Sequence, residues 1–205
     1  MTVLAVLAVV AAAFLFSEVY GYWLHVLMHD NRVEFLSRNH MIHHLVVYGP
    51  RMPQQTAGPY VASVQGRLHL GTIGVEWLLP GGAAALGLLA LFHALSLRPF
   101  LQLVFIVSAI TWSLAALSAM HDAMHVKGFW MERSPALGGW FAGLRRRHIL
   151  HHTQLDDEGR MCVDYGICFF FCDRLFGTLR REPLPFNHKG YEAALERYAF
   201  IFPRS

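Results

Sequence analysis

The longest uncharged segment of the chain places the strongest constraint on its fold. Residues 100–120 are twenty-one consecutive residues without a charged side chain. At 1.5 Å per residue, a helix of this length extends about 30 Å, which matches the hydrocarbon core of a bilayer. Residues 2–28 form a second segment, which is apolar except for Glu18 and His25. Both segments predict transmembrane helices.

A third membrane helix is predicted over residues 70–92, with Glu76 near its start and a kink at Pro80. The composition agrees, because 55% of the residues are hydrophobic and only 15% are charged, whereas soluble domains contain about 25% charged residues. A short helix is expected at 34–47, outside the bilayer. We therefore predict an all-α integral membrane protein with about three to four transmembrane helices. Residues 1–205 are treated as a single domain.

The positive charges are distributed unevenly between the two sides of the predicted membrane. Sixteen of the seventeen Lys and Arg residues lie in segments 29–70 and 121–205, and only Arg98 lies in the opposite loop. The positive-inside rule places both segments in the cytosol. Arginine outnumbers lysine by 15 to 2, which is typical of GC-rich bacteria and favours the bacterial inner membrane over the endoplasmic reticulum. The small net charge of +3 gives no reason to expect a nucleic-acid partner.

Histidines form a repeated pattern in these polar segments. In each copy, a His-x-x-x-His pair is followed by a His-x-x-His-His group, and the i, i+3 and i+4 positions share one face of a helix. Ten of the thirteen histidines belong to the pattern. The first copy contains His25, His29, His40, His43 and His44, and the second contains His121, His125, His148, His151 and His152.

Ten imidazoles in matched groups indicate a metal centre. Imidazole is a common ligand for Zn, Cu, Fe and Ni, but ten nitrogens exceed what one ion can accept. Two metal ions with about five nitrogens each, and with open positions for oxygen or water, account for the number. A zinc metalloprotease is excluded because the chain has no His-Glu-x-x-His motif. A b-type haem would need facing histidines within the membrane, whereas these pairs lie at helix ends.

Three acidic residues are candidates to support the histidines. Asp30 and Asp122 directly follow histidines of the pattern, and carboxylates commonly orient imidazole ligands. An exposed acid at a helix end is the alternative for both. Glu18 lies seven residues before His25, on the same helical face and at intramembrane depth, which indicates a functional role. The alternative for Glu18 is a structural hydrogen bond to another helix.

The four histidine groups resemble the histidine boxes of the fatty acid hydroxylase/sterol desaturase superfamily. The sequences Asp164-Tyr165-Gly166 and Asp173-Arg174-Leu175-Phe176-Gly177-Thr178 are similar to the closing motif of that family. The family often has Asn before Tyr-Gly and Trp before the second Asp, where this chain has Asp164 and Cys172. The chain is also similar in length to bacterial carotenoid hydroxylases.

This resemblance implies an integral-membrane, non-haem di-iron monooxygenase, an oxidoreductase whose ten histidines bind the metals in a cytosolic helical cap. It implies two iron ions, which zinc can replace in purified protein, and O2 as co-substrate. The expected reaction is hydroxylation of a fatty acyl, sphingoid or sterol-type lipid, and no catalytic side chain beyond the metal ligands is expected. Carotenoid ring hydroxylation, lipid desaturation and a non-enzymatic role in metal binding or transport are the alternatives. Electrons are expected from a separate ferredoxin or cytochrome b5 type donor with its reductase.

Overall fold

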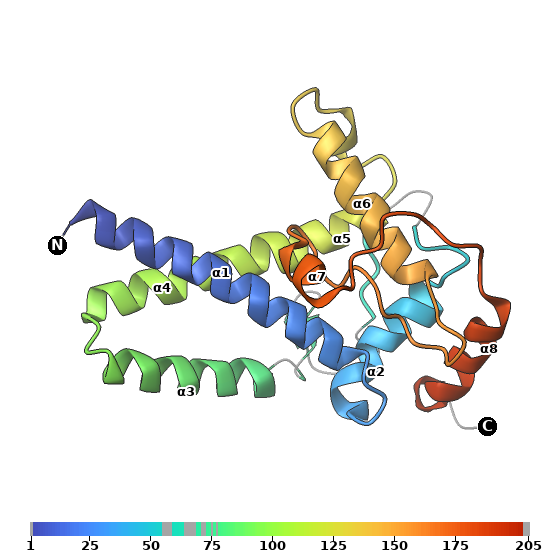
Figure 1. Ribbon diagram of the computed structural model, residues 1–205, viewed down its shortest axis with the longest axis horizontal. Coiled ribbons are helices and arrows are strands. Elements are labelled where there is room, and N and C mark those ends of the chain that lie inside the picture. Colours follow the sequence, from blue (N-terminus) through green and yellow to red (C-terminus); the bar gives the residue numbers. More distant parts are fainter. Residues whose placement is uncertain are drawn as a thin grey trace.

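The computed structural model has a mainly helical chain with one short strand pair (Figure 1). Strand β1 (His69–Leu70) pairs antiparallel with β2 (Ile73–Gly74). The structure describes residues 2–54, 59–63, 69–70, 73–74, 76 and 78–202.

Three long helices form one elongated end of the molecule (Figure 1). Helix α1 (Val3–Met28) runs alongside α4 (Pro99–Trp112), and α3 (Leu78–Ala94) returns in the opposite direction below them in this view. Helix α4 continues without a break into η3 (Ser113–Met120) and α5 (His121–His125). As a result, α1 and the α4–α5 helix both run from the apolar end towards the polar end.

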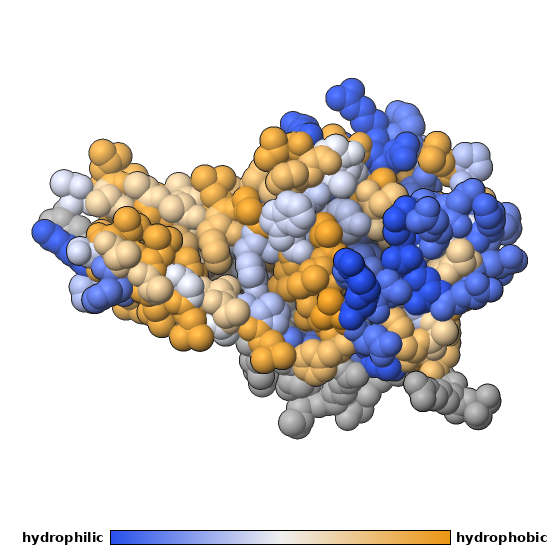
Figure 2. All heavy atoms as spheres, turned by 60° about the horizontal axis from the view of Figure 1, so that its bottom comes forward, coloured by the Kyte–Doolittle hydropathy of each residue, from blue (hydrophilic) through white to orange (hydrophobic). Residues whose placement is uncertain are grey.

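Among the described residues, two helices are long and apolar enough to cross a membrane. They are α1, with a mean hydropathy of 2.3, and the continuous helix Pro99–His125, with a mean hydropathy of 2.0. In the most apolar stretch of each helix, only 17% of the residues are buried inside the protein, and side chains such as Leu4 and Leu103 are exposed. Figure 2 shows mostly hydrophobic side chains along this end of the molecule, with hydrophilic ones at its tip, and mostly hydrophilic side chains over the other end. The exposed apolar surface suits contact with lipid.

The third predicted membrane helix differs from its expected bounds. Helix α3 begins at Leu78, and of the described residues before it, Leu70 belongs to β1 and Ile73–Gly74 form β2. Its seventeen residues extend about 26 Å, which is less than the hydrocarbon thickness of about 30 Å. The predicted kink was wrong, because Pro80 lies in the first turn of α3, where its missing N–H needs no partner. A third span therefore remains a prediction.

Shorter helices gather at the polar end of α1 (Figure 1). The helix predicted over 34–47 is present as α2 (Glu34–Ile42) followed by η1 (His43–Val47). Apolar residues of α2 and η1 pack against residues near the C-terminus, including Ala194 and Tyr198, in one buried cluster. The other helices here are η4 (Trp130–Arg133), α6 (Gly138–Thr153), α7 (Phe171–Phe176), α8 (His188–Arg197) and η5 (Ala199–Ile201).

In the described part of the chain, two helical segments are π-helices, and each contains or adjoins predicted metal ligands. Segment η1 contains His43 and His44, and η3 ends immediately before His121. A π-turn holds more residues than an α-turn, so it rotates the side chains that follow relative to those that precede it. These segments therefore help to set the directions in which the adjoining histidines point.

A tight turn fastens the chain after α6 to helix α8. Gly159 has a φ of +75°, and a Cβ atom built there would lie 2.3 Å from the backbone nitrogen of Ala194. We expect Gly159→Ala to reduce the free energy of unfolding by about 2–4 kcal/mol, because the added methyl group clashes with backbone and the positive φ is strained. Thermal unfolding of the purified protein in detergent measures this loss.

Gly143→Ala is the matched control for that substitution. Gly143 lies within α6, and an added Cβ would meet nothing within 4 Å. Alanine favours a helix over glycine by up to about 1 kcal/mol, so this variant should unfold at the wild-type temperature or above it. Equal unfolding temperatures for Gly159→Ala and the wild type would contradict the close contact with α8.

Candidate metal centre

The structure brings all ten histidines of the repeated pattern into one buried site. Among the described residues, their ligand atoms form three overlapping groups, and within each group the atoms lie within 4.8 Å of one another. The groups are His25, His29, His40, His44 and His151; His43, His121, His125 and His148; and His43, His44 and His152.

Each of the two larger groups combines both copies of the pattern. His151, from the second copy, joins four histidines of the first, and His43, from the first copy, joins three histidines of the second. The sequence suggests five ligands per half, but it gives no sign of this exchange. Segment η1, through His44 and His43, and helix α6, through His151 and His148, therefore each supply ligands to both groups, so the two halves of the chain meet at the site.

The ring nitrogens are spaced like ligands of a common ion. The Nε2 atom of His29 lies 3.1 Å from that of His151 and 3.0 Å from that of His40. In the second group, the Nε2 atoms of His125 and His148 are 2.8 Å apart. Metal–nitrogen bonds of about 2.0–2.1 Å that meet at a right angle place two nitrogens about 3 Å apart. The observed separations fit this arrangement.

Backbone carbonyl groups fix the orientation of four of the imidazoles. A carbonyl oxygen only accepts, so each Nδ1 in these pairs is protonated and the Nε2 lone pair is free for a metal. The sequence offered no signal for these partners, because any residue has a carbonyl group. The Nδ1 atoms of His25, His125, His151 and His152 donate to the carbonyls of Tyr165 (2.6 Å), Pro53 (2.7 Å), Val163 (2.6 Å) and Tyr48 (2.9 Å), respectively.

Unpartnered nitrogens provide a test of whether metal ions fit here. The Nε2 atoms of His25, His43 and His152 are buried and have no hydrogen-bond partner in the described part of the chain. A buried polar atom without a partner is unfavourable, typically by about 1–3 kcal/mol. A metal ion that accepts these lone pairs would remove the penalty, so the residues present fit a metal centre.

Burial keeps these imidazoles neutral, as metal ligands must be. It lowers the pKa of His29, His40 and His44 well below the usual value, and neighbouring imidazoles add to the shift. For His151, burial lowers the pKa to about 4, although the hydrogen bond to the Val163 carbonyl opposes the shift. At neutral pH the rings therefore present lone pairs rather than positive charges.

The three acidic candidates have different surroundings. Asp122 contacts the Nδ1 atom of His121 at 3.1 Å, so it lies where an orienting carboxylate is expected. Asp30 pairs instead with Arg32 at the surface, and the predicted contact with an imidazole is absent among the described residues.

The carboxylate of Glu18 accepts a hydrogen bond of 2.7 Å from the indole of Trp112. It therefore links α1 to α4, which is the structural alternative, and it does not line the cavity described below.

The segment after α6, residues 163–178, supports the site from outside; we call it the closing segment. Asp164 is buried with a φ of +51°, and the carbonyls on either side of it, of Val163 and Tyr165, hold His151 and His25. The sequence of this motif predicts no role for it. Its role in the structure is to orient two imidazoles.

The side chain of Asp173 holds this backbone turn in place. Its carboxylate accepts hydrogen bonds from the backbone N–H groups of Tyr165 (2.8 Å) and Gly166 (2.9 Å) and from the hydroxyl group of Thr178 (2.8 Å). Asp173 is fully buried.

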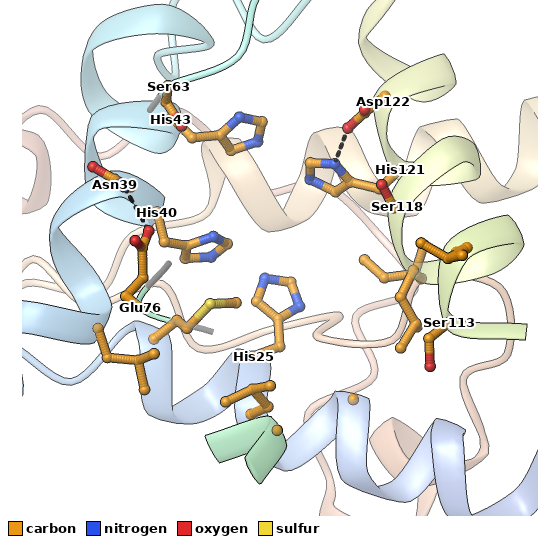
Figure 3. Close-up of a pocket in the computed structure, with 18 of the residues that line it drawn as sticks. His25, Asn39, His40, His43, Ser63, Glu76, Ser113, Ser118, His121 and Asp122 are labelled. Atoms are coloured by element: carbon orange, nitrogen blue, oxygen red, sulfur yellow. Dashed lines mark hydrogen bonds and ion pairs between the residues drawn. The ribbon is translucent and has the colours of Figure 1, made fainter. Parts of the chain in front are cut away.

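A cavity of about 250 Å³ opens beside the histidines. Four of them, His25, His40, His43 and His121, line it (Figure 3). Much of the remaining wall is apolar and comes from α1, α2 and η3. The apolar residues are Leu24, Met28, Leu36, Leu114, Leu117 and Ile167. A cavity with this lining suits a hydrocarbon chain whose C–H bonds approach the imidazole end.

A known family matches most of the chain. The family model described as fatty acid hydroxylase matches residues 10–178, a range that includes all ten histidines and the closing segment. No curated protein and no solved structure matches the chain.

Proposed function

The chain belongs to the fatty acid hydroxylase family, and we propose that it uses O2 to hydroxylate a C–H bond of a membrane lipid at a di-iron centre held by its ten clustered histidines. The observation that carries this proposal is the position of the apolar cavity, whose wall includes four of those histidines. An apolar cavity whose wall includes metal ligands gives a hydrocarbon chain access to the centre.

The residues of the chain would bind, orient and shield the reactants. Five imidazoles in one group and four in the other would hold one ion each, and His152 lies with one member of each group, His44 and His43. The backbone carbonyls that accept from the Nδ1 atoms keep the rings aimed at the centre. The apolar walls of the cavity exclude water from the C–H bond.

When bound, two iron ions would supply the activation of O2 and the oxidation of the C–H bond. The overall reaction consumes the lipid R–H, O2, two electrons and two protons and yields R–OH and water. The electrons must come from another molecule. We propose a separate ferredoxin or cytochrome b5 type protein with its reductase as the source.

The volume of the cavity favours a slim substrate. At about 250 Å³ it lies below the 300–1,000 Å³ that is usual for sites enclosing a drug-sized molecule. An acyl or sphingoid chain is therefore favoured over a fused-ring sterol or a carotenoid ring. Lys and Arg are concentrated in segments 29–70 and 121–205, which carry most of the histidines, and this supports a site on the cytosolic side. We propose the bacterial inner membrane as the location of the protein.

Mass spectrometry of total lipids and pigments tests this function. The chain is expressed with a ferredoxin and its reductase, and the matched control is the same host expressing His43→Ala. We expect a lipid that gains one oxygen only with the wild-type chain. Loss of two hydrogens would instead indicate a desaturase, and a changed pigment would indicate a carotenoid hydroxylase. An unchanged lipid and pigment profile would contradict the proposal, and metal accumulation in those cells would then indicate a binding or transport role.

A further inference from the structure

The apolar cavity contains a buried polar pair that the proposed metal chemistry does not use. Glu76 is 1% exposed and Asn39 is 5% exposed, and both line the cavity. The side-chain amide of Asn39 donates a hydrogen bond of 2.5 Å to Oε1 of Glu76 (Figure 3). In Figure 3 the pair lies on the same side of the cavity as His40.

Each member of the pair keeps one acceptor atom without a partner. Oε2 of Glu76 and Oδ1 of Asn39 are buried and have no hydrogen-bond partner in the described part of the chain. The hydroxyl group of Tyr20, on α1, is a third buried polar group of the cavity wall without a partner among the described residues, and it can donate as well as accept. A buried carboxylate oxygen without a donor is costly, so the pair is suited to a ligand that brings a donor.

The chemistry of the pair defines which ligands it accepts. Both free atoms of Glu76 and Asn39 are acceptors, so a ligand must present an O–H or N–H group to them. An ester or a plain hydrocarbon has no donor to offer. The carboxylate of a free fatty acid would meet the like charge of Glu76 and would be disfavoured.

The position of the pair places the donor close to the metals. Asn39 directly precedes His40 in α2. Both residues line the cavity, as Glu76 does. A lipid held there by its donor group would have its polar end beside the imidazoles. The rest of its chain would extend along the leucines of α1 and η3, such as Leu24 and Leu117.

We propose that Glu76 and Asn39 select a single-chain lipid that carries a hydrogen-bond donor, a hydroxyl or an amino group, at its polar end. This inference rests on the proposed function, because it takes the cavity to be the substrate site. It names the substrate class by its donor group.

Equilibrium binding to the purified, metal-loaded protein in detergent tests the proposal. Four radiolabelled probes of equal chain length are compared: stearyl alcohol, stearylamine, methyl stearate and stearate. We expect the alcohol or the amine to bind about ten-fold more tightly than methyl stearate and stearate, which corresponds to about 1.4 kcal/mol for one charge-assisted hydrogen bond. The alcohol and the amine arms show which of the two donors is preferred.

A substitution links the preference to the carboxylate. Glu76→Gln keeps the shape of the side chain but removes its charge, so we expect about ten-fold weaker binding of the preferred donor probe and tighter binding of stearate. The matched control is Glu34→Gln, the same change at an exposed position of α2. It should leave all four affinities unchanged.

The results separate failure of this inference from failure of the proposed function. Equal binding of all four probes to the wild type would show that Glu76 and Asn39 do not select the ligand and form only a structural contact. The proposed lipid site would still stand. Binding of none of the probes would overturn the lipid site itself. If Glu76→Gln fails to fold, the wild-type preference among the four probes decides the question alone.

Discussion

Replacing His151 by alanine is expected to abolish product formation and to reduce the metal bound to the purified protein from about two ions per chain to about one. His151 belongs to the first group of ligands, which would then keep four histidines. Its Nε2 atom is 3.1 Å from that of His29, and its Nδ1 atom is held by the carbonyl of Val163. Loss of the ring removes a ligand and leaves that carbonyl without its donor.

The size of the effect follows from the position of His151. Removing even an outer hydrogen-bond partner of a ligand typically costs 10- to 100-fold in metal affinity or activity, so removing the ligand should cost at least about 100-fold. Elemental analysis of the purified protein gives the metal content, and mass spectrometry of the lipids gives the product yield. The second group lacks His151, so its ion should remain.

His188→Ala is the matched control for this experiment. His188 is exposed at the start of α8, contacts the ring of Phe186 and lies outside the three ligand groups. This variant should keep both the metal content and the product yield of the wild type. If His151→Ala retained two ions and formed product at the wild-type rate, the proposed two-ion centre would be wrong.

Much of the architecture could be predicted from the sequence because apolar length and histidine spacing are local signals. The uncharged segment 100–120 lies within one continuous helix, and 34–47 is helical as expected. His25 and His121 line the same cavity because both lie near the ends of long apolar helices that run in the same direction.

Features that depend on backbone geometry could not be predicted in this way. The exchange of His43 and His151 between ligand groups depends on how the helices and the π-helical segment η1 orient the rings, which residue types do not encode. The sequence predicts Glu76 only as a charged residue near the start of a membrane helix. In the structure it precedes α3, and its partner is Asn39, thirty-seven residues earlier.

Replacing Asp173 by alanine is expected to weaken metal binding without touching a ligand. The carboxylate accepts from the backbone of Tyr165 and Gly166 and from the hydroxyl group of Thr178. Its removal leaves the two buried backbone N–H groups unsatisfied, at about 1–3 kcal/mol each, so we expect the free energy of unfolding to fall by about 3–5 kcal/mol. The turn that carries the carbonyl partner of His25 would then lose its anchor.

Metal affinity distinguishes a positioning role of Asp173 from a purely structural one. Measured well below the unfolding temperature of the variant, the affinity should fall about 10- to 100-fold, because His25 and His151 are no longer held in direction. The visible spectrum of the cobalt-substituted protein should change as well, since it reports ligand geometry. Asp157→Ala, which removes an exposed carboxylate near the same segment, should change neither readout. A less stable Asp173→Ala protein with wild-type affinity and an unchanged cobalt spectrum would restrict Asp173 to folding. The expected outcome instead makes the closing segment part of the metal centre, because it would show that the direction of a histidine ring depends on a carboxylate that never contacts it.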